Sequence, residues 1–192
     1  MATSNSRDFD LDVSDIIEEA YERCGLEVRT GYDARTARRS MNLMFADWAN
    51  RGVNLWTVRQ ATITLTNNQA TETLGADVVD LLEVVLRRSN TDFDLTRLSR
   101  GDYLSIPNKT TQGRPSQFFF NRQITPQITL WPTPENSTDQ IVYYFIRRIE
   151  DADALTNNVE LPFRFLPCAV AGMAYYIALK KAPERIQLLK NV

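Results

Sequence analysis

The longest periodic pattern in the chain runs from Asp33 to Arg51 and predicts an amphipathic helix. Apolar residues recur there at spacings of three and four, which places them on one helical face; they are Ala37, Met41, Met44, Phe45 and Trp48. Asp33 is expected to cap the first turn, because its carboxylate can accept hydrogen bonds from the free N–H groups there. Gly52 directly follows Arg51 and is expected to end the helix.

A second helix is predicted upstream, over residues 13–24. Either Asp12 or Ser14 can cap it, and the acidic residues of its first turns suit the positive end of the helix dipole. Its apolar face consists of Ile16, Ile17, Ala20, Tyr21 and Cys24. A short link separates it from the Asp33 helix, so the two are expected to form a helical hairpin.

Helical patterns return near the other end of the chain. Pro162 and Pro167 open a long helix, because proline is tolerated in the first turn. Its packing face is Ala169, Val170, Met173, Ala174, Ile177 and Ala178. Another helix is predicted to begin at Pro183 and to be interrupted by the end of the given sequence.

Between Leu55 and Ile149 the pattern changes to strands. β-branched and alternating runs predict strands at residues 56–65, 78–88, 117–122, 127–131 and 140–149, the last three as successive antiparallel strands. Ser99 is expected to cap a helical turn. Loops are predicted at residues 90–96, 109–115 and 132–136, where glycine, proline and polar residues collect.

These elements predict an α+β fold, in which an antiparallel β domain is inserted into a helical bundle. The predicted parts are an N-terminal arm (1–12), the bundle (13–53 and 161–192), the β domain (54–150) and a polar linker (151–160). Bundle packing is expected from the N-terminal hairpin and the C-terminal helices, through Met41, Phe45, Trp48, Ala174 and Ile177.

Three consecutive phenylalanines mark the strand at 117–122. Alternation places Phe119 on the face opposite Phe118 and Phe120, so both faces of this strand need a cover. Two arrangements satisfy this: a sandwich that covers both faces internally, or a cover supplied by another subunit. Phe119 is therefore a candidate subunit contact.

Three arginines, Arg35, Arg38 and Arg39, occupy the first half of the Asp33 helix. Cations in this position oppose the helix dipole. They either form a solvated face with salt bridges to the glutamates of the 13–24 helix, or they meet an acidic partner subunit. The second interpretation makes all three candidate subunit contacts.

The composition offers little to catalysis. The chain has 192 residues and no histidine, which removes the commonest general base and zinc ligand. Cys24 and Cys168 lie on predicted apolar faces and are expected to be buried, reduced thiols. The acidic run at Asp8, Asp10 and Asp12 lacks the glycine and distal glutamate of a calcium loop. The sequence predicts no catalytic, cofactor-binding or metal site, and no enzyme.

Charge and hydropathy exclude two kinds of partner. The net charge of −2 argues against strong sequence-independent binding of DNA, which needs clustered positive charge. No stretch of ~20 apolar residues is present, so no membrane span is expected. The polar, acidic N-terminus does not have the pattern of a secretory signal.

Taken in order, several segments resemble the head-to-tail adaptor proteins of short-tailed bacteriophages, including those of the tubular-tail A type. The resemblance covers most of the chain and depends on the order and spacing of the segments, none of which is a catalytic signature. The segments are Ala37–Val58, Val78–Arg87, Asp102–Pro115, Ile128–Pro134 and Pro162–Glu184.

The resemblance implies a viral structural protein at the head–tail junction of the virion, assembled in the host cytoplasm. Such adaptors form a ring, typically dodecameric, beneath the portal protein. The helical bundle builds the ring, and the β domain faces outward or toward the tail nozzle or fibre proteins. DNA crosses the lumen without specific binding, which suits a weakly acidic chain.

Two other functions fit the residues less well. A monomeric, noncatalytic binding module for a peptide or other ligand would show one exposed groove. A small hydrolase or transferase with a carboxylate site would need acidic residues that converge in a deep cleft.

Overall fold

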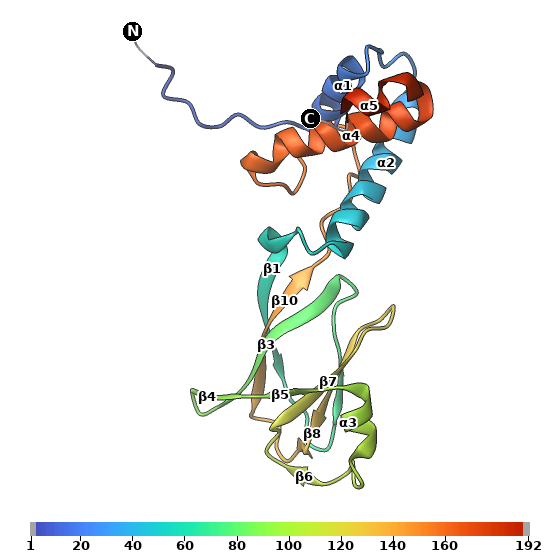
Figure 1. Ribbon diagram of the computed structural model, residues 1–192. Coiled ribbons are helices and arrows are strands. Elements are labelled where there is room, and N and C mark those ends of the chain that lie inside the picture. The colour runs from blue at the N-terminus through green and yellow to red at the C-terminus, as the bar shows by residue number, and fades with distance from the viewer. Residues whose placement is uncertain (1–2, 190–192) are drawn as a thin grey trace. The chain divides into compact units, whose positions relative to one another are not determined.

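The computed structural model describes residues 3–189 and divides into two compact units (Figure 1). Each unit has its own buried apolar core. Unit 1 takes in the chain up to Trp56 and again from Ile149, and unit 2 is Thr57–Arg148. The chain therefore leaves unit 1 once, forms all of unit 2 and then returns.

Unit 1 is helical. Its α-helices are α1 (Val13–Arg23), α2 (Gly31–Asn50), α4 (Leu166–Lys181) and α5 (Ile186–Leu189), and its 3-10 helices are η2 (Phe163–Phe165) and η3 (Pro183–Arg185). A further 3-10 helix, η1 (Leu55–Thr57), stands in the chain where unit 1 gives way to unit 2. Both α1 and α2 pack against α4. The predicted continuation of the last helix to Val192 lies outside the described residues.

Helix α2 begins earlier than its apolar pattern predicted. Its N-cap is Thr30, whose hydroxyl accepts a hydrogen bond from the Asp33 N–H at 3.2 Å. Asp33 in turn accepts from the Thr30 N–H, also at 3.2 Å. The prediction that Asp33 is the N-cap was therefore wrong. Asp33 is the third helical residue and forms the other half of a capping box with Thr30. Asp12 and Asp15 form the same reciprocal arrangement at the start of α1.

The carboxylate of Asp33 also joins α2 to the end of α4, where it pairs with Lys181. This contact lowers the pKa of Asp33 and raises the pKa of Lys181 from their ordinary values. Lys181 lies in the last turn of α4, at the negative end of that helix dipole. The two helices are therefore fixed together at this end by charge, as well as by apolar packing.

Close approach of α2 and α4 depends on Gly172. A Cβ atom added at this residue would lie 2.5 Å from the Sδ atom of Met44, which is itself buried. We expect Gly172→Val to lower the free energy of unfolding by about 1–3 kcal/mol, the usual cost of overpacking a core. The cost should shrink when Met44→Ala is added, because that change vacates the space. Urea denaturation of the single and double variants measures both effects.

A matched control for this change is Gly31→Val. Gly31 is the first residue of α2, and nothing lies within 4 Å of a Cβ atom added there. The same substitution should therefore have little effect on stability. If Gly172→Val were equally harmless, the close approach of the two helices would be contradicted.

Unit 2 is built from ten strands and one short helix. The strands are β1 (Val58–Thr64), β2 (Thr71–Thr73), β3 (Val78–Arg88), β4 (Thr91–Asp94), β5 (Thr96–Leu98), β6 (Gln112–Gly113), β7 (Gln117–Asn121), β8 (Gln127–Trp131), β9 (Thr133–Pro134) and β10 (Gln140–Arg147). The helix is α3 (Arg100–Ser105), and its N-cap is Ser99, as predicted.

The strands form two four-stranded sheets, ordered β1-β10-β3-β4 and β2-β8-β7-β5, and a small pair, β6-β9. In the first sheet the strands by which the chain enters and leaves unit 2 lie side by side, with Val58 opposite Ile146. Apolar residues from both large sheets form one core, which includes Leu81 and Leu86 from β3 and Phe118 from β7.

Three predictions for this region were wrong. The segments predicted as loops at 90–96, 109–115 and 132–136 contain β4, β6 and β9. The last three predicted strands are not consecutive neighbours, because β10 pairs with β1 and β3 instead of β8. The sheets are also not purely antiparallel, since β5 pairs with β7, and β6 with β9, in parallel. A crossover through α3 connects β5 to β7, and such a crossover is what parallel strands require.

One carboxyl group of unit 2 is buried unfavourably. Within the described part of the chain, the Oε1 atom of Glu72 on β2 is buried and has no hydrogen-bond partner. This desolvation raises the pKa of Glu72. A carboxyl with a raised folded-state pKa stabilises the fold below its unfolded-state pKa, and that contribution is lost as the pH rises through the folded-state pKa.

We therefore expect Glu72→Gln to be more stable than the parent protein at neutral pH by about 1 kcal/mol, because the amide keeps the shape of the side chain but has no charge to desolvate. The difference should disappear at a pH below about 4, where the parent carboxyl is protonated. Urea denaturation at the two pH values tests this. Glu83→Gln, on an exposed side chain of β3, is the control and should leave the stability at neutral pH within about 0.5 kcal/mol of the parent.

Candidate assembly interface

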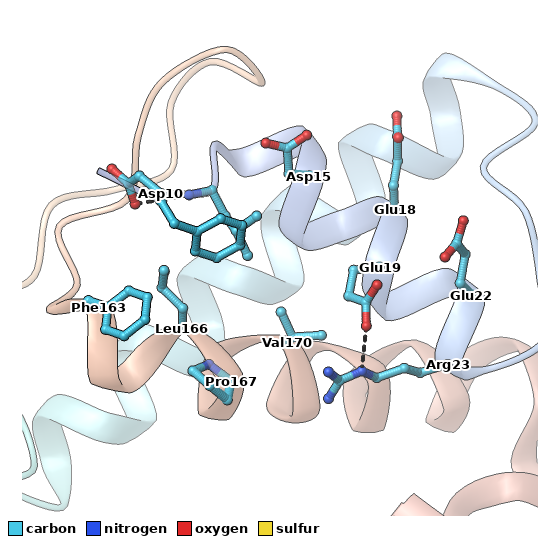
Figure 2. Close-up of a pocket in the computed structure, with 12 residues that line it drawn as sticks. Asp10, Asp15, Glu18, Glu19, Glu22, Arg23, Phe163, Leu166, Pro167 and Val170 are labelled. Carbon is cyan, nitrogen blue, oxygen red and sulfur yellow. Dashed lines mark hydrogen bonds and ion pairs between the residues drawn. The ribbon is translucent and has the colours of Figure 1, made fainter. Parts of the chain in front are cut away.

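A groove of about 600 Å³ runs along unit 1 beside α1 and the first turns of α4 (Figure 2). Its apolar lining comes from two parts of the chain that are distant in sequence: the N-terminal arm, and η2 with the start of α4 that directly follows it. The apolar residues are Phe9, Leu11, Phe163, Leu166, Pro167 and Val170. The rings of Phe9 and Phe163 meet edge to face, with centroids 6.3 Å apart, yet they are 65% and 67% exposed. Large exposed apolar side chains in one groove indicate a contact surface.

The charged lining of this groove is almost entirely acidic. It consists of Asp10, Asp15, Glu18, Glu19, Glu22 and Arg23. Glu19 is paired with Arg23, whose Nε atom lies 2.9 Å from the Glu19 Oε1 atom (Figure 2). Glu18 and Glu22 project from α1 along the rim, and within residues 3–189 neither makes an ion pair. We call this surface the acidic groove.

The opposite charge lies on α2. The spacing of its exposed residues places them in one continuous row along the helix; they are Tyr32, Arg35, Arg39, Leu43, Ala46 and Asn50. We call this row the α2 stripe. In the described part of the chain, Arg35 and Arg39 make no ion pair, so their charges face solvent.

The salt bridges considered from sequence, between the α2 arginines and the glutamates of α1, are absent among the described residues. Arg38 is partly buried, and its guanidinium donates to the backbone oxygen of Asp153 in the segment before α4. Arg38 is therefore satisfied within unit 1, unlike Arg35 and Arg39. Of the three candidate subunit contacts on α2, two are free to meet a partner.

The five residues expected to hold the bundle all contribute to the core of unit 1. Met41 and Ala174 are completely buried, and Phe45 and Ile177 are nearly so. Trp48 is partly buried and packs against the same cluster, with its ring centroid 6.1 Å from that of Phe45.

Phe119, the remaining candidate contact, lies on unit 2 and is covered within it. Its ring stacks on Tyr103 of α3 with centroids 5.1 Å apart and an interplanar angle of 9°. Phe118 and Phe120 point to the other side of β7 and are buried in the core. The stack leaves Phe119 partly buried, so any surface that it offers to a partner is limited.

The two cysteines differ. Cys24 is buried, and burial raises the pKa of its thiol. Its Sγ atom lies 3.2 Å from the backbone oxygen of Ala174, within hydrogen-bond distance. Cys168 is exposed, so the prediction that both thiols are buried was wrong for this residue. Helix α4 is apolar on several sides, so the position of Cys168 in the sequence did not indicate which face of α4 would be covered by α1 and α2.

The described residues do not group three or more side chains of histidine, cysteine, aspartate or glutamate in a way that could hold a metal ion. Nor is any helix among them long and apolar enough to cross a membrane.

Sequence reasoning identified the α2 arginines but missed the acidic groove. The helical spacing of Asp15, Glu18 and Glu22 was a usable signal, since it places three carboxylates on one exposed face of α1. The apolar half of the groove had no such signal. Phe9 and Phe163 are separated by most of the chain, and only the fold brings them together.

A known protein family matches most of this chain. No curated protein matches the chain. The model of the SU10 adaptor protein family matches residues 11–190, which include α1, α2, all of unit 2 and α4. Because the match covers nearly the whole chain, this protein belongs to the SU10 adaptor protein family, a family of phage head-to-tail adaptors.

Proposed function

We propose that this protein is a structural adaptor of a phage virion, which forms a ring beneath the portal protein and joins the head to the tail nozzle. The family match over residues 11–190 carries this proposal. The match supports a structural, non-enzymatic component of the head–tail junction that contacts other phage head and tail proteins. In this proposal the ring is dodecameric, as is typical of such adaptors.

The helical segments, residues 13–53 and 161–192, build the ring in this proposal. Their core residues hold each copy together, and the exposed charges and apolar side chains of unit 1 contact neighbouring copies. The β segment, residues 54–150, faces outward or toward the nozzle or fibre proteins, with residues 151–160 as the link. Phe119 contributes to such contacts only through the part of its ring that Tyr103 leaves open.

DNA crosses the lumen of the ring in this proposal and does not bind it specifically. The net charge of −2 supports this, because a strongly basic channel would bind the phosphate backbone and slow the passage of DNA. Assembly in the host cytoplasm, before the virion is released, belongs to the same proposal.

Two measurements test the proposal. Native mass spectrometry of the protein, alone and mixed with the cognate portal, is expected to show a ring, or a monomer that assembles only on the portal. A density map of the intact particle should then show two-unit subunits under the portal. Failure to bind the portal under any condition, with no ring formed, would contradict the proposal.

The acidic groove favours one alternative, a monomeric binding module for a peptide or other ligand. Its volume of about 600 Å³ and its exposed aromatic rings are adequate for a short peptide. This alternative predicts a stable monomer in the presence of portal, which the same mass measurement distinguishes from the adaptor.

A further inference from the structure

Unit 1 carries two unsatisfied surfaces of opposite charge. On α1, Glu18 and Glu22 stand at the rim of the acidic groove; on α2, Arg35 and Arg39 stand in the α2 stripe. Within residues 3–189, none of these four side chains forms an ion pair. One copy of the protein therefore leaves both sets of charges facing solvent, although it contains partners of the right sign.

A closed ring of identical subunits needs two different patches on each subunit, because each contact is head-to-tail. We infer that the acidic groove of one copy receives the α2 stripe of the next copy. This inference rests on the proposed ring and adds to it the two surfaces that form the contact.

The dimensions of the two surfaces agree. Asp15 to Glu22 spans about 10 Å of α1, and Arg35 to Leu43 spans about 12 Å of α2, at the usual rise per helical residue. Each row has its charged residues one turn apart, so two arginines of one helix can face two glutamates of another.

Apolar side chains accompany the charges on both surfaces. The α2 stripe exposes Leu43 and Tyr32 beside its arginines. The acidic groove exposes Phe9 and Phe163 beside its glutamates. Covering these side chains removes apolar area from water, which supplies affinity, while the charge pairs determine register and exclude wrong partners.

Charge reversal tests the pairing in the full-length protein. Glu18→Lys with Glu22→Lys, or Arg35→Glu with Arg39→Glu, is expected to weaken association between copies by at least about 100-fold, since close interfacial charge pairs couple strongly. All four substitutions in one chain should restore association to within about 10-fold of the parent, because the pairs are re-formed with exchanged signs. Sedimentation velocity, with portal added if the parent requires it, measures the association.

Matched controls carry the same changes of charge on unit 2. Glu83→Lys and Arg100→Glu alter exposed residues outside both surfaces and should leave association unchanged. Circular dichroism of every variant checks that unit 1 still folds. If a reversed variant fails to fold, the milder pair Glu18→Gln and Glu22→Gln takes its place, and association should still weaken by at least about 10-fold.

Cross-linking gives independent evidence of which surfaces meet. In a Cys168→Ser background, which removes the exposed thiol, Glu22→Cys and Arg39→Cys are introduced together. Oxidation is expected to produce a ladder of covalently linked copies on a denaturing gel. Each single cysteine variant should produce dimers at most, because a ladder needs both surfaces.

The outcomes separate this inference from the proposed function. If rings form but ignore both reversals, or if disulfides join residues only within one chain, the inference is wrong and the adaptor role stands. If reversal at Glu18 and Glu22 leaves the ring intact but abolishes portal binding, the acidic groove receives the portal, and the inference is again wrong. If neither rings nor portal binding occur for the parent protein, the proposed function and the inference both fail.

Discussion

Arg88→Met is expected to lower the free energy of unfolding of unit 2 by about 3–5 kcal/mol, the cost of leaving a buried charge without its partner. The Asp139 side chain is only 3% exposed. The Nη2 atom of Arg88 lies 2.6 Å from Asp139 Oδ2, and its Nε atom donates to the same carboxylate at 3.0 Å. Glu135 accepts from the same guanidinium at 2.8 Å. Methionine keeps most of the side-chain volume but supplies none of these donors.

Neighbouring Arg87 is the matched control. It forms an equally short ion pair with Asp92, 2.7 Å from Nε to Oδ1, but both side chains are well exposed. Arg87→Met should therefore cost less than about 1 kcal/mol. Hydrogen exchange of peptides from β3 and β10 follows unit 2 separately from unit 1 and measures both variants.

A double variant tests the physical reason. Arg88→Met with Asp139→Asn removes the buried charge together with its partner, and it should recover part of the stability lost in Arg88→Met. Two results would contradict this account. One is an equal cost for the Arg87 and Arg88 variants; the other is a double variant that is less stable by the sum of both single changes.

Met41→Ala is expected to destabilise unit 1 by about 2–5 kcal/mol, as large-to-small changes in a packed core do. Met41 is 0% exposed and lies in the core that α1, α2 and α4 share. Alanine keeps the helix propensity of α2, so the loss measures packing and not local structure. Urea denaturation followed by tryptophan fluorescence of Trp48, which packs against this core, provides the measurement.

Leu43 provides the comparison on the same helix. It is 58% exposed, so Leu43→Ala should leave the stability of the single copy within about 0.5 kcal/mol of the parent. If the α2 stripe docks in the acidic groove, the same variant should weaken association between copies. A large loss of stability for Leu43→Ala, or none for Met41→Ala, would place the core on the wrong face of α2.

The sequence was most informative where the signal is local. Met44 and Phe45 follow Met41 by three and four residues, and this spacing identified the buried face of α2. The helical period can be read from residues that are close in sequence. The strand at Val78–Arg88 and the cap at Ser99 were correctly predicted for the same reason.

What could not be predicted depends on contacts between distant segments. Strand β10 pairs with β1 and β3, and no feature of Gln140–Arg147 itself indicates those neighbours. The exposure of Cys168 likewise depends on which face of α4 the other helices cover. Thr30 was missed as a cap because it precedes the first apolar residue of the periodic pattern, while Asp33, three residues later, is the more conspicuous capping residue.

The candidate interface likewise combines residues that could be predicted from local sequence with residues that could not. Arg35 and Arg39 were identified because cations at the start of a helix are unfavourable for that helix alone. The surface that we infer to receive them was not, since its apolar half is assembled from the arm, η2 and α4.

The pairing of Val58 with Ile146 has a consequence for how such adaptors diversify. Residues opposite each other in antiparallel strands have Cα atoms only about 5 Å apart. Everything between them can thus be shortened, lengthened or exchanged for another module while the two attachment points keep their spacing. In the proposed arrangement, where unit 2 faces the tail, a phage lineage would fit a new tail to an old head by altering this single insert.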